Sequence, residues 1–94
     1  MDRIQTRVIS QLNEFIHEFK MNYDSSEGKM EYSKIHSTEL WGLLTLRDEL
    51  IRNVNDAPLV TIERFSDRMK KYSYRNNIFS YVADITDVFI RTII

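Results

Sequence analysis

The last helix-like segment of the chain, Asn77–Ile94, is apolar around more of its circumference than one core contact requires. At about 100° per residue, its aliphatic and aromatic side chains cover an arc of roughly 240°. The remaining polar edge consists of Ser80, Asp84, Asp87 and Arg91. A helix that is apolar over most of its surface is buried by neighbours on several sides. We therefore expect this segment to be the central helix, a subunit interface, or both.

Three further segments show the three-and-four residue spacing of amphipathic helices. The first covers about 2–23 and has a single apolar face. The second runs to about residue 53 and starts at Ser37 or Thr38, because either hydroxyl can cap a helix. The third covers about 58–74 and starts at a proline, which the first turn of a helix tolerates well. With the C-terminal segment, the pattern predicts four helices.

The segments between these helices carry residues that favour turns. Asp24–Gly28 combines short polar residues with a glycine and is predicted to be a loop, and Asn55–Pro58 marks a second boundary. The pattern of 29–36 fits either a short helical turn or a non-helical segment that covers the edge of the core. No segment shows the sustained alternation of a strand. We predict an all-α fold: a compact antiparallel bundle of about four helices with the C-terminal helix central, in which residues 1–94 form a single domain.

Composition sets limits on the class of protein. A chain of 94 residues with 43% hydrophobic and 29% charged residues suits one domain with a packed core. The formal net charge of −1 predicts no overall attraction to nucleic acid or membranes. The absence of cysteine excludes disulfides and thiol nucleophiles. With a polar N-terminus and no apolar run of about 18 residues, we expect a soluble, cytoplasmic protein without membrane contact.

Residues suited to catalysis do not form a recognisable set. The serines lack a glycine-flanked nucleophile turn, and two histidines and two glycines supply neither a triad pattern nor a phosphate-cradling loop. Glu14 and His17 lie one helical turn apart, as the ligands of helical metal sites do. This motif occurs once and on the polar side of its helix, so we interpret it as a solvated pair, with metal binding as the lesser hypothesis. We expect no enzyme activity and no cofactor.

A basic ridge is predicted on the third helix, where four cationic residues recur at intervals of four, three and four. Such a ridge can neutralise phosphates or receive an acidic protein partner. Acidic residues share the helix, and no nucleic-acid-binding signature accompanies it. We therefore favour a solvated face or an acidic protein partner over nucleic acid. The ridge consists of Arg64, Arg68, Lys71 and Arg75.

Arg47 falls inside the apolar face of the second helix. Its guanidinium must reach water along an apolar stem or pair with a carboxylate such as Asp84 or Asp87. Both interpretations are structural, and we favour them over a ligand-binding arginine because buried arginine is rarely unpaired. A carboxylate facing it across a symmetric interface would instead specify a dimer.

These features favour a small non-enzymatic protein-interaction or regulatory module, which self-associates as a homodimer through its C-terminal helix or binds another protein. This prediction rests on the surplus of apolar surface on that helix and on the lack of a recognisable group of catalytic residues. The alternative function is nucleic-acid binding through the basic ridge. The candidate interface consists of Phe79, Val82, Phe89, Ile90, Ile93 and Ile94.

Overall fold

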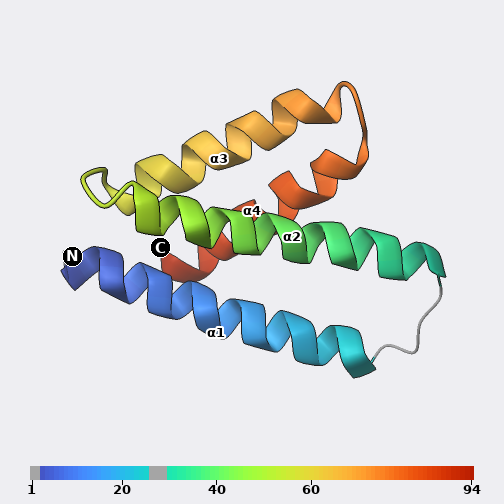
Figure 1. The fold of residues 1–94 in the computed structure, drawn as a ribbon, viewed down its shortest axis with the longest axis horizontal. Helices are drawn as coiled ribbons and strands as arrows, with labels where there is room; N and C mark the ends of the chain where they lie inside the picture. Colours follow the sequence, from blue (N-terminus) through green and yellow to red (C-terminus); the bar gives the residue numbers. More distant parts are fainter. Residues whose placement is uncertain (1–2, 26–29) are drawn as a thin grey trace.

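Four α-helices contain most of the residues that the computed structural model describes, which are 3–25 and 30–94. Successive helices run in opposite directions (Figure 1). No strand occurs in the described ranges, and the predicted all-α antiparallel bundle is confirmed. The helices are α1 (Arg3–Ser25), α2 (Met30–Arg52), α3 (Pro58–Ser73) and α4 (Ile78–Ile93).

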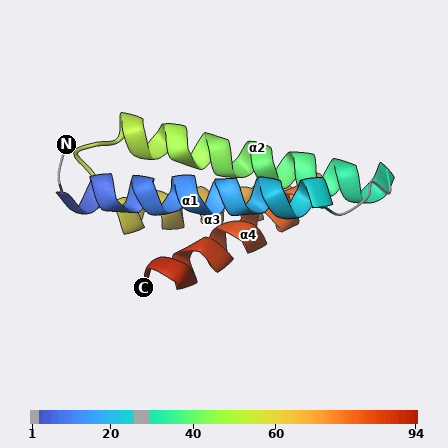
Figure 2. The same ribbon diagram turned by 90° about the horizontal axis from the view of Figure 1, so that it is seen from below.

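The middle of the bundle is formed by two helices, α2 and α4. In Figures 1 and 2, α1 and α3 lie on opposite sides of this pair. Every pair of helices is in contact, and the contacts of the C-terminal helix with α3 and α2 are the most extensive, as its wide apolar arc predicted. α2 also packs extensively against α1, so the central position is shared.

The buried core takes apolar residues from every helix, at the helical spacing that the sequence showed. Phe65 and Phe89 are the largest of its fully buried side chains, and Phe15 meets Phe89 with ring centroids 5.4 Å apart. The described members of the core are Val8, Leu12, Ile16, Leu43, Leu46, Leu50, Ile62, Phe65, Met69, Val82, Ala83 and Phe89.

Gly42 lets the two middle helices approach closely. It lies within α2, and a Cβ atom built there would stand 2.3 Å from Val82 Cγ1 of α4. Real Cβ atoms essentially never come so close to another heavy atom, so a larger residue at this crossing would force Val82 or the two helices to shift. The contact explains why a helix-weakening residue occupies the interior of a long helix.

Two predicted boundaries are wrong. α2 begins at Met30, so the ambiguous segment before Ser37 is helical from that residue onward. Thr38 does not cap the helix, because its hydroxyl donates to the Lys34 carbonyl one turn earlier. α1 extends to Ser25, which places the start of the predicted loop inside the helix, and 26–29 lie outside the described residues.

α4 is less enclosed than its apolar arc predicted. Tyr81 and Val88 are exposed along one side, next to Asp84 and Arg91, so the polar edge is wider than expected. Ile94, just past the last helical residue, is 86% exposed.

Candidate functional site

Several apolar residues that sequence periodicity assigned to the core are exposed, and they gather at one end of the bundle. There the start of α1, the α2–α3 connection and the end of α4 surround a hollow of about 480 Å³. In Figure 2 the C-terminal end of α4 diverges from α1 and α2. We call it the apolar hollow; its apolar lining residues are Ile4, Val8, Val54, Ala57, Pro58, Leu59 and Ile93.

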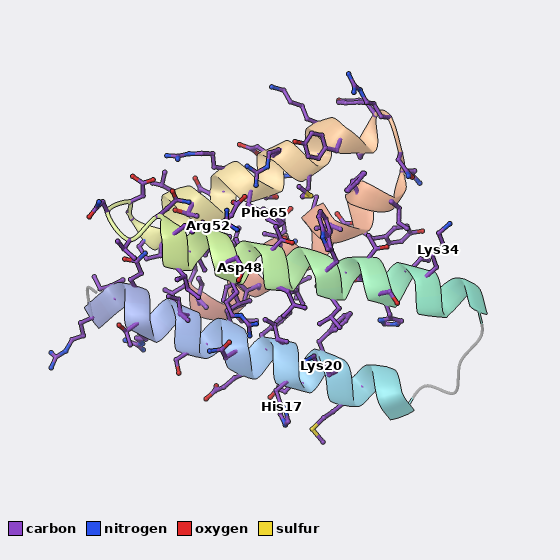
Figure 3. The ribbon with its side chains drawn as sticks, viewed as in Figure 1. His17, Lys20, Lys34, Asp48, Arg52 and Phe65 are labelled. Carbon is purple, nitrogen blue, oxygen red and sulfur yellow. The ribbon has the colours of Figure 1, made fainter. Side chains whose placement is uncertain are left out.

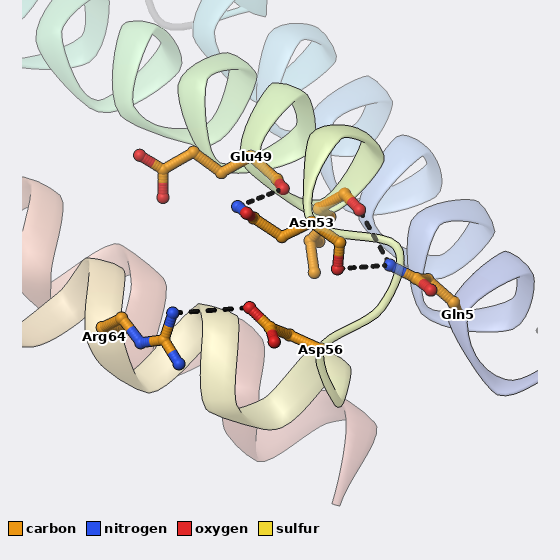
Figure 4. Close-up of polar contacts among 6 residues, drawn as sticks. Gln5, Glu49, Asn53, Asp56 and Arg64 are labelled. Atoms are coloured by element: carbon orange, nitrogen blue, oxygen red, sulfur yellow. Dashed lines mark hydrogen bonds and ion pairs between the residues drawn. The ribbon is translucent and has the colours of Figure 1, made fainter.

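A buried amide holds the wall of the apolar hollow in place. The Gln5 side chain is almost fully buried, and its Nε2 donates to the Leu50 carbonyl at 2.8 Å and to the Asn53 carbonyl at 3.2 Å. The Asn53 amide in turn donates to the Glu49 carbonyl at 2.9 Å (Figure 4). Carbonyls at a helix end lack partners within the helix. Gln5 donates to two of these carbonyls, and the two hydrogen bonds fix α1 to the end of α2.

A second, polar hollow of about 320 Å³ lies on the other side of the same α2–α3 corner. We call it the arginine hollow. Arg52 lies on the side of α2 that faces α3 (Figure 3). Arg68 pairs with Glu49 and stacks over the Phe65 ring, with its guanidinium carbon 5.5 Å from the centroid. The lining residues are Glu49, Arg52, Asn53, Thr61, Arg64 and Arg68.

The predicted basic ridge is partly used within the chain. Arg64 pairs with Asp56 at 3.4 Å and Arg68 pairs with Glu49, so both arginines turn toward the α2–α3 corner. Lys71 is exposed on α3. Arg75 lies beyond the end of α3 at Ser73, where its backbone N–H donates to the Tyr72 carbonyl in a turn. The last member of the ridge therefore follows the end of α3, and the use of these four residues as a partner surface stays a prediction.

The six candidate interface residues do not share one surface. Val82 and Phe89 are fully buried within the chain, so they have no surface to offer a partner. Phe79, Ile90 and Ile93 are partly buried and pack against the core. Only Ile94 is largely exposed. Sequence periodicity measures how apolar a helix is and not whether its own chain covers it, which is why these residues were grouped.

Glu14 and His17 lie on the exposed side of α1, and Figure 3 shows the His17 side chain pointing away from the other helices. Within the described ranges, no group of three or more histidine or acidic side chains is placed to hold a metal ion. Arg47 donates from Nη1 to the Asn13 Oδ1 atom at 3.0 Å. Its partner is therefore an amide of α1 and not the predicted carboxylates of α4.

One carboxyl group between α2 and α4 has a shifted pKa. Burial is the larger cause and the negative charge of Asp84 the smaller, and together they raise the pKa of Glu39 from 4.5 to about 6. The His36 Nδ1 atom lies 3.8 Å from a Glu39 carboxylate oxygen. His36 and Glu39 lie several turns along α2 from the α2–α3 corner, and neither they nor Asp84 line either hollow.

No protein-family model, curated protein or solved structure matches the chain. Among the described residues, none of the helices combines the length and apolar character needed to cross a bilayer. The two hollows at the α2–α3 corner are the features from which a function can be argued.

Proposed function

We propose that this protein is a helical protein-interaction module that self-associates through the apolar hollow. The observation that carries the proposal is the placement of apolar residues left out of the core. Ile4 is 63% exposed and Leu59 is 42% exposed, and both line the same hollow. Contiguous exposed apolar surface around a concavity is typical of interaction sites.

A second copy of the chain is the occupant that fits best. Ile93 lines the hollow, and Ile94 projects into solvent directly after it. In a twofold contact, the same patch meets itself, so Ile94 of each copy can enter the hollow of the other. Burying one isoleucine side chain stabilises by about 1.5–3 kcal/mol, and the symmetric contact contains two.

The proposal retains self-association through the C-terminal helix, and of the six candidate interface residues it keeps Ile93 and Ile94 at the contact. The absence of enzyme activity and a cytoplasmic location stay predictions from the sequence. The nucleic-acid alternative has less support, because Arg64 and Arg68 already pair with carboxylates of the same chain.

Light scattering across a dilution series tests the proposal, with Leu59→Glu as the disruptive variant. Glutamate suits the first turn of α3, because a negative charge there is favourable, so the variant is expected to fold. Val88→Glu is the matched control, since Val88 is also 42% exposed but lies on α4 outside the hollow.

We expect the unmodified chain and Val88→Glu to show the mass of a dimer at high concentration, and Leu59→Glu to stay monomeric. An unmodified chain that is monomeric at every workable concentration would contradict the proposal. So would equal weakening by both substitutions, because the apolar hollow would then have no special role.

A further inference from the structure

The arginine hollow contains more hydrogen-bond donors than the chain itself uses. Its lining carries three guanidinium groups and one carboxylate, a surplus of two positive charges. Asp56, which pairs with Arg64 from beside the hollow, lowers this surplus but leaves it positive. Each guanidinium has five N–H donors, so one ion pair leaves several donors available.

Arg52 is the cation that no carboxylate neutralises. It makes no ion pair with any described residue, whereas Arg64 and Arg68 each have an acidic partner. Arg68 is held over the Phe65 ring, and that contact fixes its guanidinium before any ligand arrives. A partly preorganised group loses less conformational freedom on binding.

A buried hydroxyl in the same hollow also lacks a partner. Thr61 is 3% exposed and lines the hollow, and its Oγ1 atom has no hydrogen-bond partner among the described residues. A buried polar atom without a partner is costly, so a ligand that bonds to it recovers that cost. Thr61, Arg64 and Arg68 share one face of α3, because they are spaced by three and four residues.

We propose that the arginine hollow binds a phosphate group. Guanidinium forks match phosphate oxygens in pairs, and a hydroxyl donor adds one more bond to the same tetrahedral anion. A carboxylate has only two oxygens and a single charge, so it uses fewer of the donors that converge here. The inference does not depend on self-association, because the two hollows have no lining residue in common.

Titration with inorganic phosphate, followed by NMR of the arginine side chains and the Thr61 amide, tests the proposal. Two variants remove donors: Arg52→Gln removes the unpaired guanidinium, and Thr61→Val replaces the hydroxyl with a methyl group of similar shape. Arg75→Gln is the matched control, since Arg75 is exposed and outside the hollow. Each variant is also made in Leu59→Glu, so that the result is read on monomeric protein.

We expect Arg52→Gln to weaken phosphate binding about tenfold and Thr61→Val to weaken it roughly fivefold, with Arg75→Gln unchanged. A phosphoserine peptide is compared with its unphosphorylated form in the same titration. Tighter binding of the phosphopeptide than of inorganic phosphate would identify a phosphorylated protein as the source, and equal binding would identify a free phosphate.

Three results would overturn the proposal. The first is the absence of binding at phosphate concentrations on the order of 10 mM. The second is an equal response to chloride or acetate at the same ionic strength, which marks general screening. The third is tighter binding of a single-stranded oligonucleotide than of phosphate, with an affinity that Arg52→Gln and Arg75→Gln lower equally. That pattern indicates an extended nucleic-acid surface.

Discussion

Single polar residues inside the bundle decide how its ends are closed. Gln5 lies on the apolar side of α1, where periodicity calls for an aliphatic residue, yet its amide serves two carbonyls at the end of α2. Ser66 is similarly buried and donates to Asp87 of α4 at 2.8 Å, which in turn pairs with Lys70 at 3.5 Å. Buried polar groups are tolerated when they find such partners.

Glu39 gives the stability a pH dependence. Its pKa is raised from 4.5 in the unfolded chain to about 6 in the folded one, so the folded state binds more protons between these values. This group's contribution to stability therefore falls as the pH rises through that window and stays low above it. We expect Glu39→Gln to raise the free energy of unfolding at pH 7 by about 1 kcal/mol, allowing for solvent screening.

Urea unfolding at a series of pH values measures this effect. The advantage of Glu39→Gln should shrink toward zero as the pH falls to 4.5, where the carboxyl is largely protonated in the folded state. Glu63→Gln, an exposed change of the same chemistry on α3, is the matched control. A constant difference between Glu39→Gln and the unmodified chain at every pH would show that the carboxyl does not titrate as described.

At the scale of helices, the crossing of α2 and α4 depends on Gly42. We expect Gly42→Ala to destabilise by about 1 kcal/mol net, because steric overlap with Val82 outweighs the gain in helix propensity. Val82 has a branched Cβ and little rotamer freedom in a helix, so it cannot swing aside. The free energy of unfolding in urea measures the loss.

A double-mutant cycle separates this contact from a general effect of alanine. Val82→Ala alone leaves a cavity and should also destabilise. Combined with Gly42→Ala, it removes the overlap. The loss of unfolding free energy in the double variant should therefore be about 1 kcal/mol smaller than the sum of the two single-variant losses. Simple additivity would mean that α2 and α4 are not held at the distance described.

At the scale of the whole molecule, the bundle is complete in its middle and open at one end. The core is continuous through all four helices, but the end of α4 leaves the apolar hollow beside α1 and α3. If a second copy closes this end, folding and association are linked. The thermal midpoint of unfolding then rises with protein concentration.

Differential scanning calorimetry at two concentrations, roughly tenfold apart, measures this shift. We expect the midpoint to rise by a few degrees for the unmodified chain and for Val88→Glu, and to stay constant for Leu59→Glu. If the midpoint is independent of concentration in all three proteins, a second copy does not close the open end of the bundle, and the proposed self-association is contradicted.

Local pattern was enough to predict the four helices and the antiparallel arrangement of successive helices (Figure 1). The spacing of Leu12, Leu43, Phe65 and Phe89 identified residues that are buried, since a 3.6-residue period requires no knowledge of the partner helix. The proline at 58 marked the start of α3 correctly. The start of α2 was missed because Ser37 and Thr38 resemble a cap, whereas the helix begins at Met30.

Which apolar residues the chain covers, and which it leaves open, was decided only when the helices packed. Ile4, Leu59 and Ile94 have the same helical spacing as core residues but are exposed. Ile4 and Leu59 line the apolar hollow, and Ile94 follows its lining residue Ile93. Likewise, Arg52 and Thr61 are remote from one another in the periodic pattern and meet only at the α2–α3 corner. Periodicity describes one helix at a time, whereas a hollow is a property of the space between helices.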